Sequence, residues 1–300
     1  MSTGDSETDP PTDGRPPEPA AADDPRVTAL RELIGIVDRL RAPDGCPWDR
    51  AQTEESMAPC VVEEAHELVE AIEDGEAAAV AGEAGDVLLN VLLICKIAEQ
   101  DGRFDLARAA ELTSAKLLRR HPHVFGPRGA ADASAAFERW EEVKRAERAA
   151  AAKEGDGAAP ADTSALAGVP RAMPALLRAL RVSAKAVAAG FRWRDVGGAL
   201  GKVREELGEL ESSLPAAAVE SVGEPELAAE EWSRIDHELG DLLMSTAFLA
   251  SYLGRDPEGL CRRAVRRFEE RFRALEAACD GDLQRDLDEL EAAWSRVKEG

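Results

Sequence analysis

The chain carries one acidic pattern twice, and this repeat limits the folds that it can adopt. The segment EEAHEL begins at Glu63, and the similar segment EELGEL begins at Glu205, 142 residues later. A second acidic segment follows each of them, EAGDVLL at Glu83 and ELGDLLM at Glu238, 155 residues apart. Self-similarity of this kind indicates one structural unit used more than once. The two spacings differ by 13 residues, which we assign to an insertion around residues 216–225, because loops tolerate extra length.

Both copies have the periodicity of helices. Apolar residues recur at steps of three and four, whereas runs of β-branched residues with period two are nearly absent. The helices predicted in the first copy are 27–41, 57–74, 76–100 and 106–120, with a turn at 42–49. Those predicted in the second copy are 172–188, 196–212, 227–253 and 257–278, with an extra helix at 283–298. We therefore expect an all-α fold of two tandem four-helix-bundle domains.

Two segments of low hydrophobicity set the predicted domain boundaries. Residues 1–25 are acidic and rich in proline, with almost no large apolar side chains, so they predict a disordered tail. The small and polar stretch 149–169 has the character of a linker. The domains are thus predicted at 26–148 and 170–300.

Composition excludes several classes of partner. A net charge of −22 would repel a polyanion, so nucleic acid is not expected as a partner. The five cysteines lack CxxC spacing and predict neither a disulfide framework nor a zinc site. The chain begins without a signal-like segment, and the apolar run 87–94 is too short to span a bilayer. We expect a cytoplasmic protein that has no membrane partner.

The acidic segments predict metal sites. On a helix, positions i, i+3 and i+4 share a face, so each helix of the pair presents a group of carboxylates. Apolar runs after Asp86 and Asp241 predict that their helices are buried on most sides, where carboxylates are costly unless they are coordinated. Ligands that are all oxygen select hard cations. Mg²⁺ is the expected cofactor, and Mn²⁺ is the alternative.

These motifs resemble the MazG family of nucleoside triphosphate pyrophosphohydrolases over most of the chain, from about residue 27 to 276. The segments that carry the resemblance are GCPWDRAQT (45–53), EExxE (63–67), ExxD (83–86), KLLRRHPHVF (116–125), GFRW (190–193), KVREELGEL (202–210), HELGDLL (237–243) and RRFEERF (266–272). The resemblance implies an all-α homodimer that hydrolyses nucleoside triphosphates between the α- and β-phosphates, releasing a monophosphate and pyrophosphate. Removal of aberrant nucleotides is the role expected at family level.

The resemblance also implies roles for individual residues. The implied metal ligands are Glu64, Glu67, Glu83, Asp86, Glu206, Glu209, Glu238 and Asp241. Glu63 and Glu205 would assist the ligands or orient the attacking water. Lys202, Arg267 and Arg271 would contact the nucleotide.

Three basic residues and one tryptophan are further candidates for nucleotide binding. Lys116, Arg119 and Arg120 form a positive patch that could hold phosphates, although positive charge is also favoured at a helix C-terminus. Trp48 could stack on a base, or it could anchor a loop to the core.

A non-catalytic protein that binds nucleotides or acts as a scaffold is the alternative function. Complete ligand sets in both copies argue against it, whereas Glu270 and Arg192 depart from the family's pattern in the second copy. Measurement of turnover separates the two possibilities.

Overall fold

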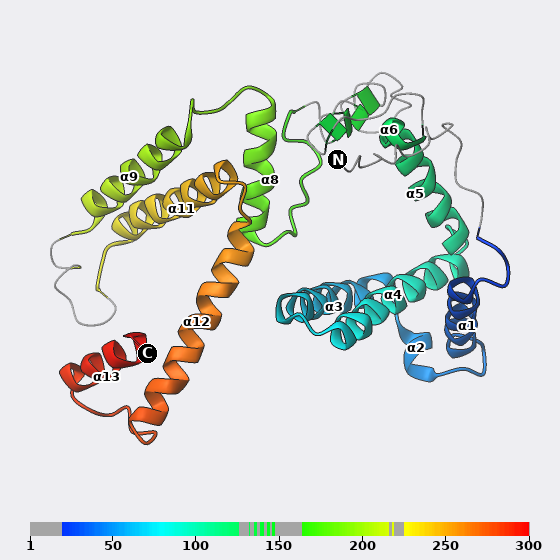
Figure 1. Ribbon diagram of the computed structural model, residues 1–300, viewed down its shortest axis with the longest axis horizontal. Coiled ribbons are helices and arrows are strands. Elements are labelled where there is room, and N and C mark those ends of the chain that lie inside the picture. The colour runs from blue at the N-terminus through cyan, green and yellow to red at the C-terminus, as the bar shows by residue number, and fades with distance from the viewer. Residues whose placement is uncertain are drawn as a thin grey trace, which may run out of the picture. The chain divides into compact units, whose positions relative to one another are not determined.

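The computed structural model describes residues 20–125, 164–215 and 225–299, with a few positions between 132 and 147 and residue 218. Within these residues the regular secondary structure is helical and contains no strand, so the all-α prediction is confirmed. The chain divides into two compact units, 1–158 and 159–300, each with its own helices (Figure 1). Most of the predicted tail, linker and insertion lies outside the described residues.

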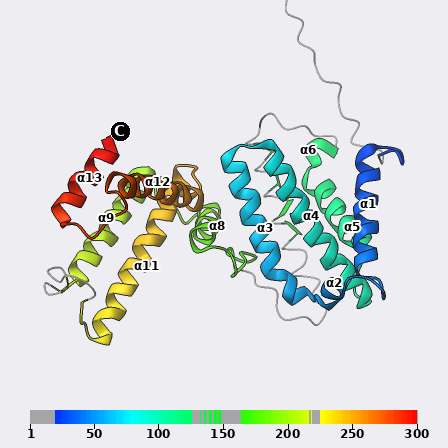
Figure 2. The same ribbon diagram turned by 90° about the horizontal axis from the view of Figure 1, so that it is seen from below.

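The first unit is built around one long helix. Its helices are α1 (Pro25–Leu40), α2 (Pro47–Ala51), α3 (Glu54–Asp74), α4 (Ala77–Gln100), α5 (Leu106–Arg120) and α6 (Pro122–Phe125). Helix α4 packs along α3 and also contacts α1 and α5, so these helices lie side by side around it (Figure 2). The predicted helices of this copy are present, and α5 has the predicted bounds. The stretch predicted as a turn is partly wrong, because α2 begins inside it at Pro47.

Local signals in the sequence place the ends of α3. Thr53 and Ser56 form a reciprocal capping box at its first turn, which satisfies two backbone N–H groups. Gly75 ends the helix with φ = 80°, a left-handed conformation that glycine adopts without a steric cost. The chain then reverses directly into α4, which fixes the α3–α4 pair as an antiparallel hairpin.

The core of the first unit lies at one end of this hairpin. Val37, Met57, Leu92, Leu93 and Ile97 form a buried apolar cluster. Helix α4 is the one described helix that is long and apolar enough to cross a membrane, by length and composition alone. Because α4 supplies three of the five cluster residues, its apolar second half forms the core of the unit.

The second unit repeats the hairpin. Its helices are α8 (Ala175–Ala188), α9 (Val196–Ser213), α11 (Ala229–Tyr252), α12 (Pro257–Ala278) and α13 (Leu287–Glu299). Helices α9 and α11 pack as closely as α3 and α4 do, while α8 and α12 contact α11. Helix α13 is the predicted extra helix, and it packs on α12 through a small cluster around Leu275 and Cys279. Each unit thus contains one acidic helix pair on a helical support.

Candidate metal centre

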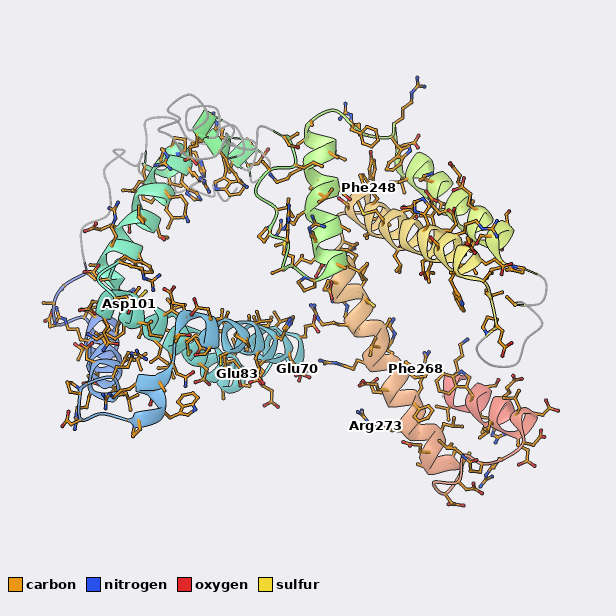
Figure 3. The ribbon with its side chains drawn as sticks, turned by 180° about the vertical axis from the view of Figure 1, so that it is seen from behind. Glu70, Glu83, Asp101, Phe248, Phe268 and Arg273 are labelled. Atoms are coloured by element: carbon orange, nitrogen blue, oxygen red, sulfur yellow. The ribbon has the colours of Figure 1, made fainter. Side chains whose placement is uncertain are left out.

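The first copy brings three predicted ligands together. Glu64 on α3 and Glu83 and Asp86 on α4 each offer a carboxylate oxygen, and these oxygens lie within 4.8 Å of one another. Glu83 lies in the first half of α4 (Figure 3). The carboxylate of Glu67, the fourth predicted ligand, lies close enough to that of Glu83 to raise the pKa of Glu83. The antiparallel hairpin is the reason for this arrangement, because it sets the acidic turn of α3 against that of α4.

The carboxylates of this first group repel one another. Desolvation and the neighbouring charges of Glu67 and Asp86 raise the pKa of both Glu64 and Glu83 above the ordinary glutamate value. The predicted burial of these helices on most sides is wrong at the acidic end, because Asp86 is exposed and the Asp241 side chain is 49% exposed. Apolar runs mark the helix face that packs on the core, and that packing begins only after the acidic turn. A cation would therefore relieve both the desolvation of Glu64 and Glu83 and the repulsion from their neighbours.

The second copy gathers a similar group that includes a lysine. Oxygens of Glu206, Glu209 and Glu238 lie within 4.8 Å of one another, and Glu206 is only 5% exposed. The Lys202 ammonium lies 2.6 Å from a Glu206 oxygen and 2.9 Å from a Glu205 oxygen. These hydrogen bonds raise the pKa of Lys202, so it stays charged throughout the working pH range.

Asp241 stands apart from the second group. Its carboxylate lies 3.4 Å from His237 Nε2, one turn earlier on α11. Three of the four predicted ligands thus converge in each copy. The fourth is Glu67 in the first copy, which lies beside the group, and Asp241 in the second, which contacts His237 instead.

Both groups have the chemistry of a site for a hard cation. Their donors are carboxylate oxygens, and three oxygens within 4.8 Å can share one ion. Mg²⁺ commonly takes one or two protein carboxylates and completes its octahedral shell with water and phosphate oxygens. The residues therefore fit a divalent cation that binds together with a phosphate substrate.

Comparison with known proteins gives the family. The model of the MazG nucleotide pyrophosphohydrolase domain matches residues 52–125, which span α3, α4 and α5. The chain is 36% identical over 277 residues to a nucleoside triphosphate pyrophosphohydrolase of Escherichia coli K12, covering 91% of this chain and 98% of that protein. The chain belongs to the MazG family. A nucleoside triphosphate pyrophosphohydrolase/pyrophosphatase MazG of Thermotoga maritima is 33% identical over 275 residues, covering 90% of this chain and 96% of that protein.

The two MazG copies differ at the position one turn before the acidic segment. Lys202 occupies it in the second copy, and Cys60, 142 residues earlier, occupies it in the first. The difference can be found in the sequence, since Cys60 and Lys202 fall in the same column when EEAHEL is aligned with EELGEL. A cation therefore accompanies the carboxylates of the second copy but is replaced by a thiol in the first.

The basic residues of the first copy are held by an acid that the sequence did not reveal. Glu147 accepts hydrogen bonds from Arg120 Nε at 2.9 Å and Nη2 at 2.6 Å, and a further one from Arg119 Nε. Arg120, followed by Arg119, lowers the pKa of Glu147 to about 2. Among the described residues, Lys116 makes no such contact. The structure thus joins two predicted phosphate contacts to a carboxylate.

The other predicted contacts to the nucleotide lie in different settings. Arg267 and Arg271 project from α12 and form no ion pair with the described residues. Trp48 is 63% exposed, so it does not anchor its loop to the core. Trp193, the tryptophan of the GFRW segment in the second copy, packs edge-on against Phe248, with ring centroids 5.1 Å apart.

Proposed function

We propose that this MazG protein hydrolyses nucleoside triphosphates to a monophosphate and pyrophosphate, with Mg²⁺ as cofactor and Mn²⁺ as a possible substitute. A water molecule adds across the α–β anhydride bond, and pyrophosphate leaves. The observation that carries the proposal is the pair of carboxylate groups, one with Lys202 beside it, in a chain that aligns with nearly the full length of named pyrophosphohydrolases.

The proposed roles follow the chemistry of each group. The proposed cation ligands are Glu64, Glu67, Glu83 and Asp86 in the first copy, and Glu206, Glu209, Glu238 and Asp241 in the second. The cation supplies charge neutralisation at the phosphates. Glu63 and Glu205 are exposed beside their groups, where a carboxylate can accept a proton from a water molecule and orient it.

Cationic side chains are proposed to hold the phosphates of the substrate. Lys202 lies directly beside the second carboxylate group, and Arg267 and Arg271 stand on α12 of the same unit. Lys116, Arg119 and Arg120 have the same role in the first copy, where the exposed ring of Trp48 is available to stack on a base. Removal of aberrant nucleotides is the proposed cellular role.

We propose that the chain works as a cytoplasmic homodimer of two-domain protomers, with domains at 26–148 and 170–300. Large apolar side chains are exposed on both hairpins and can pack on a second copy. They include Leu88 and Val91 on α4, Leu207 on α9, and Leu239 and Leu243 on α11. The strong negative charge supports the exclusion of nucleic acid, and we propose no membrane partner.

Release of pyrophosphate from a panel of nucleoside triphosphates tests the activity. The wild-type chain is assayed with Mg²⁺, with Mn²⁺ and with excess chelator, beside Glu67→Gln and Glu209→Gln. We expect metal-dependent release and a loss of roughly 10²-fold or more when the ligand of a working copy is neutralised. If no triphosphate yields pyrophosphate under any metal condition, the hydrolase proposal fails and the non-catalytic alternative replaces it.

A further inference from the structure

Asn90 is a buried side chain whose amide has no partner. The residue is 6% exposed on α4, and its amide makes no hydrogen bond within the described part of the chain. Buried amides are nearly always hydrogen-bonded, because an unmade bond costs the full desolvation of the group. Asn90 is not among the side chains whose unpartnered atoms are sealed from solvent, so its amide keeps a small solvent-exposed surface.

The helix places Asn90 beside the first carboxylate group. Positions 83, 86 and 90 are separated by three and four residues, so Asn90 shares the face of α4 that carries Glu83 and Asp86. One turn of helix, about 5.4 Å, separates it from Asp86 along the axis. Asn90 therefore lies one helical turn beyond Asp86, on the side away from the Gly75 turn.

The hairpin register identifies the residue across from Asn90. The Glu67 carboxylate lies close to that of Glu83, and one turn further along, an Asp86 oxygen lies within 4.8 Å of a Glu64 oxygen. The same antiparallel step places Cys60 across from Asn90. Cys60 does not satisfy the amide, because its thiol is directed to the Ser56 carbonyl oxygen at 3.8 Å.

We call the pair of positions that Cys60 and Asn90 occupy a layer of the hairpin. In the equivalent layer of the second copy, both side chains have a partner. Lys202 occupies the place of Cys60 and pairs with two carboxylates. Ser245 occupies the place of Asn90, is equally buried, and donates its hydroxyl to the Leu242 carbonyl oxygen at 3.0 Å. Both copies thus keep a buried polar residue here, and only Asn90 has its hydrogen-bonding groups unused.

We propose that Asn90 determines substrate specificity in the first copy, by hydrogen bonding to the nucleoside part of a bound triphosphate. The inference rests on the proposed function, which sets the phosphates at the carboxylate group. A neutral amide offers two donor hydrogens and an acceptor, which match a base edge or a sugar hydroxyl. The second copy offers a charged lysine in this layer, which matches a phosphate.

Binding measurements on the full chain test this role. Glu209→Gln removes a ligand of the second copy, so that binding to this parent reports on the first copy. Calorimetry with Mg²⁺ and nucleotides that carry an imido link between the α- and β-phosphates gives affinities without turnover. One panel varies the base, and a second compares each ribonucleotide with its 2′-deoxy form. We expect the parent to discriminate roughly tenfold or more within one panel, and Asn90→Ala to reduce that discrimination to about threefold or less.

Two further variants keep the result interpretable. Ser245→Ala in the same parent is the matched control and should leave both panels unchanged. Asn90→Leu keeps the volume and removes the amide, and its thermal unfolding shows whether the unit folds. A folded Asn90→Leu chain that retains the preference of its parent overturns the inference. So does the absence of nucleotide binding to the Glu209→Gln parent when the wild type releases pyrophosphate, whereas a wild type without release refutes the proposed function itself.

Discussion

The two acidic hairpins carry the same series of positions but fill one layer of it with opposite chemistry. In order away from the connection between the two helices, the equivalent positions of the first copy are Glu67/Glu83, Glu64/Asp86, Cys60/Asn90 and Met57/Leu93, and those of the second are Glu209/Glu238, Glu206/Asp241, Lys202/Ser245 and Ala199/Phe248. The outer two layers keep their carboxylates in both copies. The third layer is neutral in the first copy and cationic in the second.

The innermost layer shows how the common fold is kept. Met57 and Leu93 are buried in the first copy, and Ala199 and Phe248 are buried in the second. The first copy thus has two medium-sized residues at these positions, and the second has a small residue and a large one. Packing constrains total volume more than identity. The core thus tolerates exchange, whereas we expect a single exchange in the third layer to change what the site binds.

The largest effect should come from exchanging this third layer. Lys202→Cys gives the second copy the residue of the first, and we expect kcat/KM for pyrophosphate release to fall roughly 10²-fold, because a charged donor beside the phosphates is lost. Since the pKa of Lys202 is raised, the deficit should be constant from neutral to alkaline pH.

Cys60→Lys is the reverse exchange. It removes a cysteine where Lys202→Cys adds one, so the two variants together show whether the number of cysteines affects the rate. It should not lower the rate of the wild-type chain. Equal rates for Lys202→Cys and the wild type would show that the difference between the layers has no catalytic consequence.

Metal-free unfolding compares the repulsion in the two carboxylate groups. The pKa of Glu83 is raised, so protonation favours the folded state, and this stability is present below the ordinary value of 4.5 and lost as pH rises through the raised value. In chelator, Glu83→Gln should therefore raise Tm at pH 7.5 and leave it unchanged below the ordinary glutamate pKa.

Glu209→Gln should raise Tm less under the same conditions. A hydrogen bond with Glu206 and desolvation raise the pKa of Glu209, but Lys202 acts in the opposite direction. Calorimetry at both pH values gives the comparison. A larger rise for Glu209→Gln than for Glu83→Gln would contradict the assigned role of Lys202.

The smallest effect concerns Arg119 and Arg120 of the first copy, which are paired with Glu147, whereas Arg267 and Arg271 of the second copy form no ion pair with the described residues. Glu147→Gln should destabilise the chain by about 1 kcal/mol, since the carboxylate is held by two arginines. Glu111→Gln removes a looser pair with Arg108 on the same helix, at 3.5 Å, and should cost close to nothing.

Chemical denaturation at several pH values measures both variants. The deficit of Glu147→Gln should not change between pH 5 and pH 8, because the pKa of Glu147 is about 2 and the group stays ionised. Equal stabilities for the two variants would show that the double arginine contact adds nothing to folding.

The sequence by itself determined the helices and the repeat, and it placed the acidic residues of each copy on shared helix faces. Apolar steps of three and four placed α5 and α12 at their observed bounds, and Gly75 marked the turn between the acidic helices. These features are local, because helix periodicity and turn geometry depend on neighbours within a few residues. The spacing of carboxylates along each helix follows from the same local rule.

Only the tertiary structure decided which side chains meet. The antiparallel packing brings Glu64 of α3 to Glu83 and Asp86 of α4, and it leaves Asp241 with His237 rather than with the other predicted ligands. The sequence likewise gave no indication that Arg119 and Arg120 share Glu147, which lies 27 residues beyond Arg120. Contacts of this kind depend on how whole helices pack, and the order of residues along a single helix does not encode them.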